Sequence, residues 1–146
     1  MASNPLIGTW KLLSWENRSV EEDGRISYPL GEDATGYIMY NQDGYMFVAI
    51  MSPYRLKFAG GDLLSGTTEE EAQAEETILS YCGRYELRED RVIHQIELSS
   101  FPNWVSVDQE RLMELGENRL TLSTHPMLMQ GKKQTAHLIW ERVSEP

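Results

Sequence analysis

The chain has 146 residues, a length that fits one domain with its own hydrophobic core. Its 13 Lys and Arg against 23 Asp and Glu give a formal net charge of −10. That balance argues against binding to nucleic acid or to an anionic membrane surface, because both need concentrated positive charge. The one cysteine, Cys82, excludes an internal disulfide, and the first residues lack the basic and apolar regions of a signal peptide. We therefore expect a single cytoplasmic domain over residues 1–146.

Alternation of apolar and polar residues predicts strands in the first third of the chain. Residues 7–17 form the first predicted strand, residues 25–30 a short extended piece, and residues 36–40 and 45–51 two further strands. Asp43-Gly44 lies between the last two. Because glycine readily adopts the positive φ of a tight turn, this pair favours a β-hairpin.

One helix is predicted, over residues 68–80. Thr67 and Thr68 precede three glutamates at positions 69–71. Hydroxyl caps and early carboxylates both suit the positive end of a helix dipole, so this order of residues is typical of a helix start. The glutamate-rich face is interpreted as a solvated face.

Five more strands are predicted after the helix, over residues 84–88, 91–99, 104–115, 119–124 and 134–143. The short, turn-like links between them indicate antiparallel neighbours. About eight strands in one small domain must protect their edges, and closure into an up-and-down barrel does so. The sequence therefore predicts an all-β, eight-stranded antiparallel barrel with one inserted helix, a size that can hold one small ligand.

The two ends of the chain carry a pattern that resembles lipocalins. Gly8-Thr9-Trp10 lies in the first strand and Trp140-Glu141-Arg142 ends the last. In the lipocalin pattern an arginine of the final strand stacks on the tryptophan of the first, and a cation–π contact of this kind closes one end of the barrel.

A wider set of segments resembles the lipocalin-like domain family of small bacterial and fungal proteins. The segments run over essentially the whole chain, at residues 6–12, 29–37, 43–46, 101–105, 108–111 and 120–123. The resemblance implies a calycin-type barrel of about this length. It implies no single function, although some members occur with genes for secondary-metabolite biosynthesis.

Strand alternation predicts which polar side chains face the barrel interior. In the strand over 91–99, His94 shares the more apolar face with Val92, Ile96 and Leu98, whereas Glu97 points outward. In the strand over 104–115, the face of Val105, Val107 and Met113 also carries Gln109 and Arg111. An inward arginine needs a partner, because an unpaired buried charge is costly. His94, Gln109 and Arg111 are therefore candidate ligand contacts.

Further candidates come from side-chain parity on other strands. Tyr81 and Tyr85 share parity with Leu87, and we expect them to face inward. Tyr40 and Met46 could line or cap the cavity, and Trp104 lies at the rim unless a bulge turns it inward. Two plainer interpretations stay open: His94 as a core histidine satisfied by a neighbour, and Gln109 with Arg111 as an internal structural network.

Two functions from different classes follow. The first is binding of a small hydrophobic molecule with a polar or anionic group inside the barrel, since an apolar cavity with a few polar groups is the usual small-molecule site. The second is a cofactor-independent isomerase or cyclase of polyketide- or terpenoid-like metabolites. In it, His94 is the acid or base and Arg111 the oxyanion stabiliser. We expect no cofactor and no metal, because the three histidines are scattered. A homodimer is left open.

Overall fold

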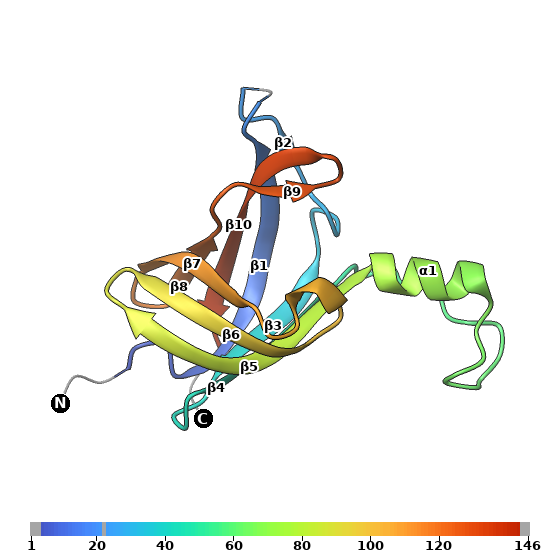
Figure 1. Ribbon diagram of the computed structural model, residues 1–146, viewed down its shortest axis with the longest axis horizontal. Coiled ribbons are helices and arrows are strands. Elements are labelled where there is room, and N and C mark those ends of the chain that lie inside the picture. The colour runs from blue at the N-terminus through green and yellow to red at the C-terminus, as the bar shows by residue number, and fades with distance from the viewer. Residues whose placement is uncertain (1–3, 22, 144–146) are drawn as a thin grey trace.

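The strands of the computed structural model, which describes residues 4–21 and 23–143, close into a barrel (Figure 1). Eight antiparallel strands follow one another around the ring, and the last pairs back to the first. They are β1 (Gly8–Ser19), β3 (Thr35–Tyr40), β4 (Tyr45–Met51), β5 (Ile78–Arg88), β6 (Arg91–Ser99), β7 (Asp108–Leu115), β8 (Arg119–Ser123) and β10 (Lys132–Arg142). The short strands β2 (Ile26–Ser27) and β9 (Met127–Met129) pair with β1 and β10. The predicted eight-stranded barrel is confirmed.

The hairpin between β3 and β4 forms at the predicted turn. Gly44 has φ of 92°, a conformation that costs other residues a steric penalty. The amide of Asn41 donates to the carbonyl oxygen of Tyr45 at 2.8 Å and closes the turn. Alternation along both strands then buries Ile38 and Val48 in the core.

A bulge between β5 and β6 changes which side chains point inward. The register shifts between Cys82 and Gly83, where an added Cβ would collide with the carbonyl oxygen of Gln95. Ile96 therefore stays buried, whereas Leu98 is 67% exposed. The predicted inward position of Leu98 is wrong, because the extra residue of a bulge reverses the alternation beyond it.

The predicted strand over residues 104–115 begins later than expected. A short 3₁₀-helix, η1 (Pro102–Trp104), precedes it, and β7 starts at Asp108. Pro102 supplies the fixed φ of a helical first turn, and Ser106 adopts a φ of 64°, which interrupts an extended chain. This turn redirects Trp104 towards the barrel.

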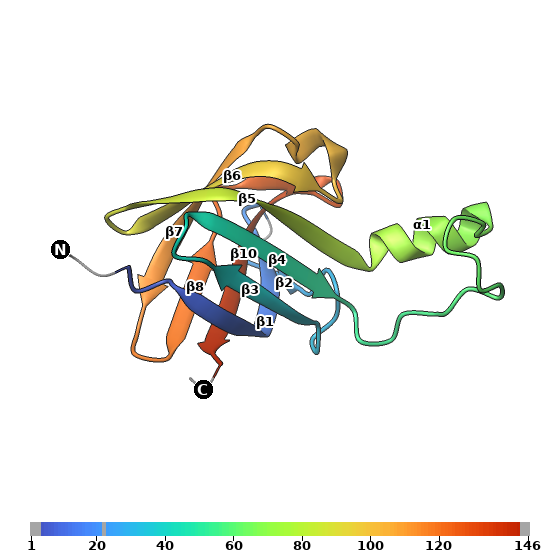
Figure 2. The ribbon, with the colours of Figure 1, turned by 90° about the horizontal axis from the view of Figure 1, so that it is seen from below.

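The helix α1 (Thr68–Glu76) starts where predicted but ends before residue 80. The Thr67 hydroxyl accepts from the amide of Glu70 at 3.1 Å, and the Glu70 carboxylate accepts from the amide of Thr67 at 2.9 Å. The helix ends early because Ile78 already pairs with Met51 of β4. Together with the preceding loop, α1 projects from the barrel as an arm (Figure 2). Among the described helices, none has the length and apolar character needed to cross a membrane.

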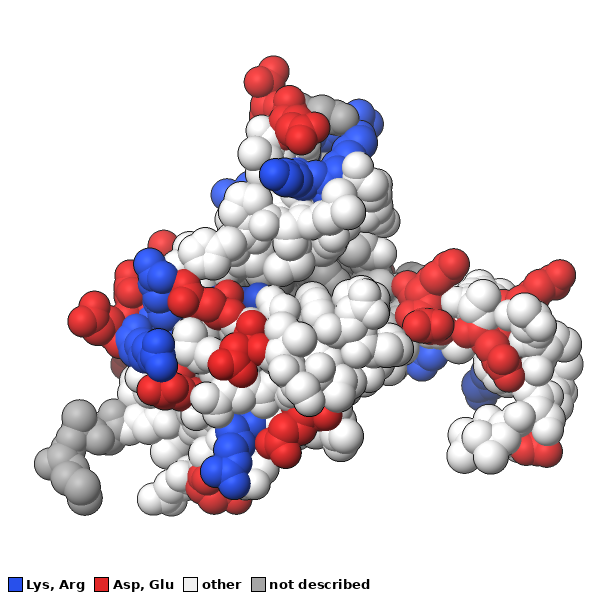
Figure 3. Space-filling view, in the orientation of Figure 1, with Lys and Arg blue, Asp and Glu red and all other residues white. Residues whose placement is uncertain are grey.

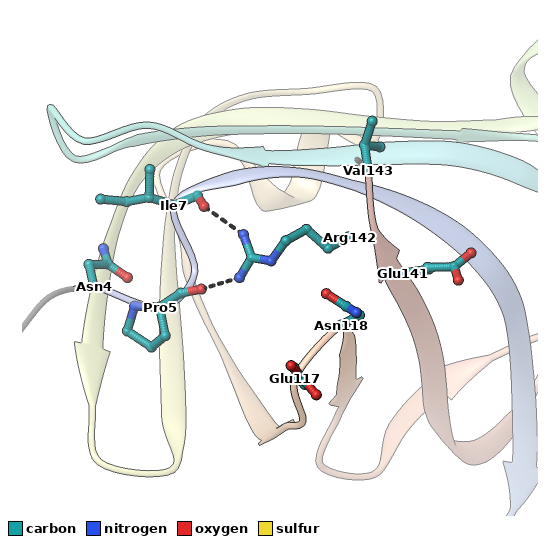
Figure 4. Close-up of a pocket in the computed structure, with 8 residues that line it drawn as sticks. All are labelled: Asn4, Pro5, Ile7, Glu117, Asn118, Glu141, Arg142 and Val143. Carbon is teal, nitrogen blue, oxygen red and sulfur yellow. Dashed lines mark hydrogen bonds between the residues drawn. The ribbon is translucent and has the colours of Figure 1, made fainter. Parts of the chain in front are cut away.

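One end of the barrel is closed by the predicted arginine–tryptophan pair, whose arginine is drawn in Figure 4. The Arg142 guanidinium lies 4.1 Å from the centre of the Trp10 ring, which is fully buried. Arg142 also donates to the carbonyl oxygens of Ile7 at 3.0 Å and Pro5 at 2.7 Å. Both terminal nitrogens of the Arg142 guanidinium therefore donate to the backbone. The hollow of about 630 Å³ at this end is an open, polar surface depression.

Candidate functional site

A cavity lies inside the barrel, away from the closed end. Its deep wall consists of buried side chains from all parts of the ring, among them Trp15, Ile38, Ile50, Tyr81, His94, Arg111, Leu122, Thr124 and Trp140. The half-buried lining side chains are Leu79, Trp104, Met127, Met129 and Leu138. They come from the start of β5, from η1, from β9 and from β10, so the cavity opens on that side.

The face that carries β9 and η1 has few charged side chains near its middle (Figure 3). Lys, Arg, Asp and Glu gather instead around its edges and along the arm. The cavity volume is about 50 Å³, which is room for a few waters at about 10–15 Å³ each. The interior is thus a narrow apolar space, and its half-buried lining side chains lie on the face that has few charges near its middle.

A buried chain of three aromatic residues forms one wall. The Tyr40 hydroxyl lies 2.6 Å from His94 Nε2, and the Tyr81 hydroxyl lies 2.7 Å from His94 Nδ1. Tyr81 lines the cavity, whereas Tyr40 lies behind His94 and packs edge-on against Tyr85. His94 is 1% exposed, so both ring nitrogens are satisfied inside the protein.

His94 is neutral at physiological pH. Burial lowers its pKa well below the usual value, and the nearby positive charge of Arg111 lowers it further. A neutral imidazole has one donor and one acceptor nitrogen, so one tyrosine donates to the ring and the other accepts from it. Burial raises the pKa of both Tyr40 and Tyr81, which therefore keep their protons.

The surroundings of the two hydroxyls decide which tyrosine donates to His94 and which accepts from it. If Tyr40 accepted from His94, its own proton would lie in a fully buried place, at a cost of about 1–3 kcal/mol. Tyr40 therefore donates to Nε2, and Nδ1–H donates to Tyr81. The proton of Tyr81 is then left for the cavity, which Tyr81 lines. The three residues together present one hydrogen-bond donor to the interior.

Arg111 is a buried cation without a carboxylate. It is 6% exposed, and no acidic side chain of the described residues lies within ion-pair distance of it. Its Nη1 donates to the side-chain oxygen of Gln109 at 3.2 Å and to the carbonyl oxygen of Glu110 at 3.3 Å. The guanidinium lies 5.6 Å from the centre of the Trp104 ring. Its charge is thus only partly compensated, which favours an anionic or strongly polar partner in the cavity.

Trp140 presents a second unpaired donor. Among the described residues, its indole nitrogen is the buried side-chain polar atom that has no hydrogen-bond partner. The side chain lines the cavity from β10. Trp15, by contrast, donates to Asn17 at 2.8 Å. A ligand oxygen that reached Trp140 would remove the cost of its unpaired N–H group.

A model of a protein family, described as the lipocalin-like domain, matches residues 7–143. The chain belongs to the lipocalin-like domain family. This agrees with the resemblance of its segments and with the arginine–tryptophan pair that closes the barrel.

One protein similar to this lipocalin-like chain is named as the carrier of a particular small molecule. It is the 4'-hydroxy-3'-methoxypropiophenone carrier protein ppsC of Aspergillus oryzae, which is 36% identical over 107 residues. The match covers 67% of this chain and 96% of the relative. Among solved structures, a single-substitution mutant of the fluorescent protein UnaG is similar, with a TM-score of 0.40 and 14% identity. That match covers 95% of this chain and 96% of the other.

The structure of this lipocalin-like chain brings half of the predicted ligand contacts to the cavity. His94, Arg111, Tyr81 and Trp104 all line it. Trp104 was expected at the rim unless a bulge turned it inward, and the 3₁₀ turn does so. Its ring meets Tyr81 edge-on, with centroids 5.8 Å apart. The direct acid or base role predicted for His94 does not fit this placement, because tyrosines occupy both of its nitrogens.

Four other predicted contacts do not line the cavity. Gln109 is half-buried and acts on Arg111 instead. Tyr40 is buried behind His94, and Met46 belongs to the core of β4. The Tyr85 hydroxyl donates to the carbonyl oxygen of Asn41 at 2.7 Å. Parity placed Tyr85 on the inner face, and it does lie opposite His94 on β6, but hydrogen bonds to Asn4 and Asn41 hold its hydroxyl away from the cavity.

Several lining residues were missed by the sequence analysis. Ala136, Leu138 and Trp140 alternate along β10, so the parity argument applied to the last strand would have found them. Met127 and Met129 lie on a three-residue strand that is too short to show a period. Trp15 follows a bulge in β1 between Leu12 and Ser14, which hides its orientation.

Proposed function

We propose that this protein binds a small hydrophobic molecule with an acceptor oxygen inside the barrel, as a carrier. One observation carries the proposal: Arg111 is a buried cation in an apolar cavity and has no carboxylate partner among the described residues. A cation of this kind is costly unless a bound group compensates it. The Tyr81 hydroxyl offers a further donor to the same space, and Trp140, whose buried indole N–H has no partner, also lines it.

The relative named as a carrier suggests the size and type of ligand. Its named cargo, 4'-hydroxy-3'-methoxypropiophenone, is an aromatic ketone with oxygen atoms at both ends. Aromatic carbon would contact the apolar wall, and an oxygen would meet Arg111. We extend this ligand class, an aryl ketone, to the present chain as part of the proposal.

A ligand of this size needs more room than the cavity of about 50 Å³ offers. The half-buried side chains at the opening would have to move. Met127 and Met129 suit this role, because the unbranched thioether side chain adopts many shapes at low cost. Binding is therefore expected to reorder β9, the strand that carries both methionines.

Titration of the protein with 4'-hydroxy-3'-methoxypropiophenone tests the proposal. Trp15, Trp104 and Trp140 line the cavity, so intrinsic fluorescence reports binding there. We expect saturable binding at one site, weakened about 100-fold in Arg111→Met, which loses about 2.7 kcal/mol of binding free energy. Arg84→Met is the matched control, since Arg84 lies 4.9 Å from the ring of Tyr45 on the outside of the barrel. Absence of binding, or equal binding by Arg111→Met, contradicts the proposal.

An isomerase or cyclase that uses the same cavity is the second candidate. The observation that favours it is the Tyr81 hydroxyl, which is linked to a buried neutral histidine. The group that would exchange a proton with a substrate is then Tyr81, since His94 is enclosed. Deuterium exchange at the carbon next to the ketone, followed by NMR, tests it. Exchange accelerated by the protein and lost in Tyr81→Phe supports catalysis, whereas an unchanged rate supports a carrier.

A further inference from the structure

We propose that the cavity binds its ligand as an oxyanion, with the negative oxygen between the Arg111 guanidinium and the Tyr81 hydroxyl. The inference rests on the proposed function and specifies its ligand class. The ligand is a phenol or enol made acidic by a conjugated carbonyl group. It gives up its proton to the solvent when it binds, and the protein is not protonated in exchange.

The charges around the cavity favour an anion. Arg111 is the charged residue of the cavity lining, which as described contains no Asp and no Glu. Its neighbour Glu110 is turned away: the Glu110 carboxylate accepts from Arg91 at 2.5 Å and from His125 at 2.8 Å on the outer face. No described carboxylate is therefore placed to neutralise Arg111, and an anionic ligand would do so.

The hydrogen-bond donors around the proposed site also favour an anion. With Tyr40 as the donor to Nε2, the Tyr81 oxygen accepts from His94 Nδ1–H, and this arrangement leaves the Tyr81 proton for the ligand. Arg111 has only donors: Nη1 is engaged by Gln109 and by the backbone, and the guanidinium also interacts with the Tyr81 oxygen beside it. A neutral phenol between Tyr81 and Arg111 would have to donate its own proton to a further acceptor, which neither of these two groups supplies. Its anion accepts from both.

The titratable groups that line this place or lie directly behind it come from four strands. They are Tyr40 on β3, Tyr81 on β5, His94 on β6 and Arg111 on β7. Burial raises the pKa of both tyrosines and lowers that of His94, so neither the tyrosines nor His94 change their charge between neutral and mildly alkaline pH. Any pH dependence of binding in that range therefore reports ionisation of the ligand.

The absorption spectrum of a bound acyl phenol tests the inference. The probe is 4'-hydroxy-3'-methoxypropiophenone, whose phenolate absorbs at longer wavelength than the phenol. In buffer one pH unit below the phenol's own pKa, we expect the bound probe to show the phenolate band. The dissociation constant should fall about 10-fold for each pH unit raised towards that pKa, since the free ligand must lose one proton to bind.

The methyl ether of the same ketone, which cannot ionise, is the matched control ligand. We expect it to bind at least about 10-fold more weakly than the phenol and with no pH dependence. In Arg111→Met the phenolate band of the saturated complex should disappear, and in Tyr81→Phe it should shift, with circular dichroism confirming that both variants are folded. Tyr40→Phe removes the donor to His94 and should weaken the preference for the anion without abolishing binding.

The outcomes separate the two proposals. Equal binding of the phenol and its methyl ether, or a bound phenol that shows its neutral spectrum, overturns the oxyanion inference and leaves the carrier function standing. Failure of both ligands to bind overturns the proposed function itself. A phenolate band that persists in Arg111→Met also overturns the inference, because the anion would then be held elsewhere.

Discussion

Two arginines lie over tryptophan rings inside this barrel, and their surroundings differ. At the closed end, Arg142 lies 4.1 Å from the centre of the Trp10 ring and donates to two backbone carbonyl oxygens. In the cavity, Arg111 lies 5.6 Å from the centre of the Trp104 ring, and among the described residues it meets no carboxylate. The backbone holds the guanidinium of Arg142, whereas the guanidinium of Arg111 has no charged partner among the described residues.

Two buried tryptophans, Trp10 and Trp140, differ in the same way, in whether the protein supplies a hydrogen-bond partner. Trp10 donates its indole N–H to the carbonyl oxygen of Leu6 at 3.0 Å, whereas the indole N–H of Trp140 is buried without a partner. Residue type alone therefore does not separate a structural pair from a binding pair. What separates them is whether the protein satisfies each donor, since an unsatisfied buried group is retained at a cost in stability.

The largest effect is expected from the cavity arginine. Arg111→Met should weaken binding of an aryl ketone ligand about 100-fold while leaving the free energy of unfolding unchanged or slightly higher. The reason is that the ligand loses its charged partner, whereas the fold loses a desolvated cation with few contacts. Fluorescence titration and urea unfolding measure the two quantities. A loss of stability above about 2 kcal/mol would mean that Arg111 is structural after all.

The closed-end arginine should behave in the opposite way. Arg142→Met is expected to lower the free energy of unfolding by about 2 kcal/mol, because it removes two hydrogen bonds and a cation–π contact. Ligand affinity should change less than about two-fold, since this contact lies outside the cavity lining. The same two assays apply. A large loss of affinity at unchanged stability would break the proposed division between the two ends.

Low pH should lower the stability of the folded protein through His94. Its pKa is lowered in the folded protein by burial and by Arg111, so the unfolded chain takes up a proton below about pH 6.5 while the folded chain does not. The free energy of unfolding should therefore fall by about 1.4 kcal/mol per pH unit from this residue as pH drops below that value.

Two histidine variants isolate that contribution. Unfolding of His94→Gln, whose side chain can also donate and accept, should lack this part of the pH dependence between about pH 7.5 and 5.5. His125→Gln is the control, because His125 is exposed and contacts Glu110 on the surface. If the slope of His94→Gln equals that of the unsubstituted protein, His94 is not buried in its neutral form.

The smallest effect is expected at the unpaired indole. Trp140→Phe should change the free energy of unfolding by less than about 1 kcal/mol, since the lost volume is offset by removal of the buried N–H. Trp10→Phe, which breaks the bond to Leu6, should cost more. Affinity for an aryl ketone should fall about three-fold in Trp140→Phe, and an unchanged affinity would mean that the ligand does not reach the indole.

Much of the fold followed from the sequence because its signals are local. Asp43-Gly44 predicted its hairpin, and Thr67 with Glu70 started the helix where the capping box forms. Alternation placed His94 and Arg111 inside, and both line the cavity. Alternation failed at Leu98, which is exposed, because the bulge at Gly83 depends on the pairing of β5 with β6 and not on the sequence of one strand.

The sequence by itself determined the class of fold and the chemistry available to it: a barrel of antiparallel strands with inward His94 and Arg111. Only the tertiary structure decided which groups share one space. It enclosed His94 between Tyr40 and Tyr81, moved Tyr85 out of the cavity, and brought Trp104 over Arg111. The physical reason is that side-chain parity is a property of each strand, whereas contact inside a barrel depends on strand register, bulges and height along the axis, which arise only when the ring closes.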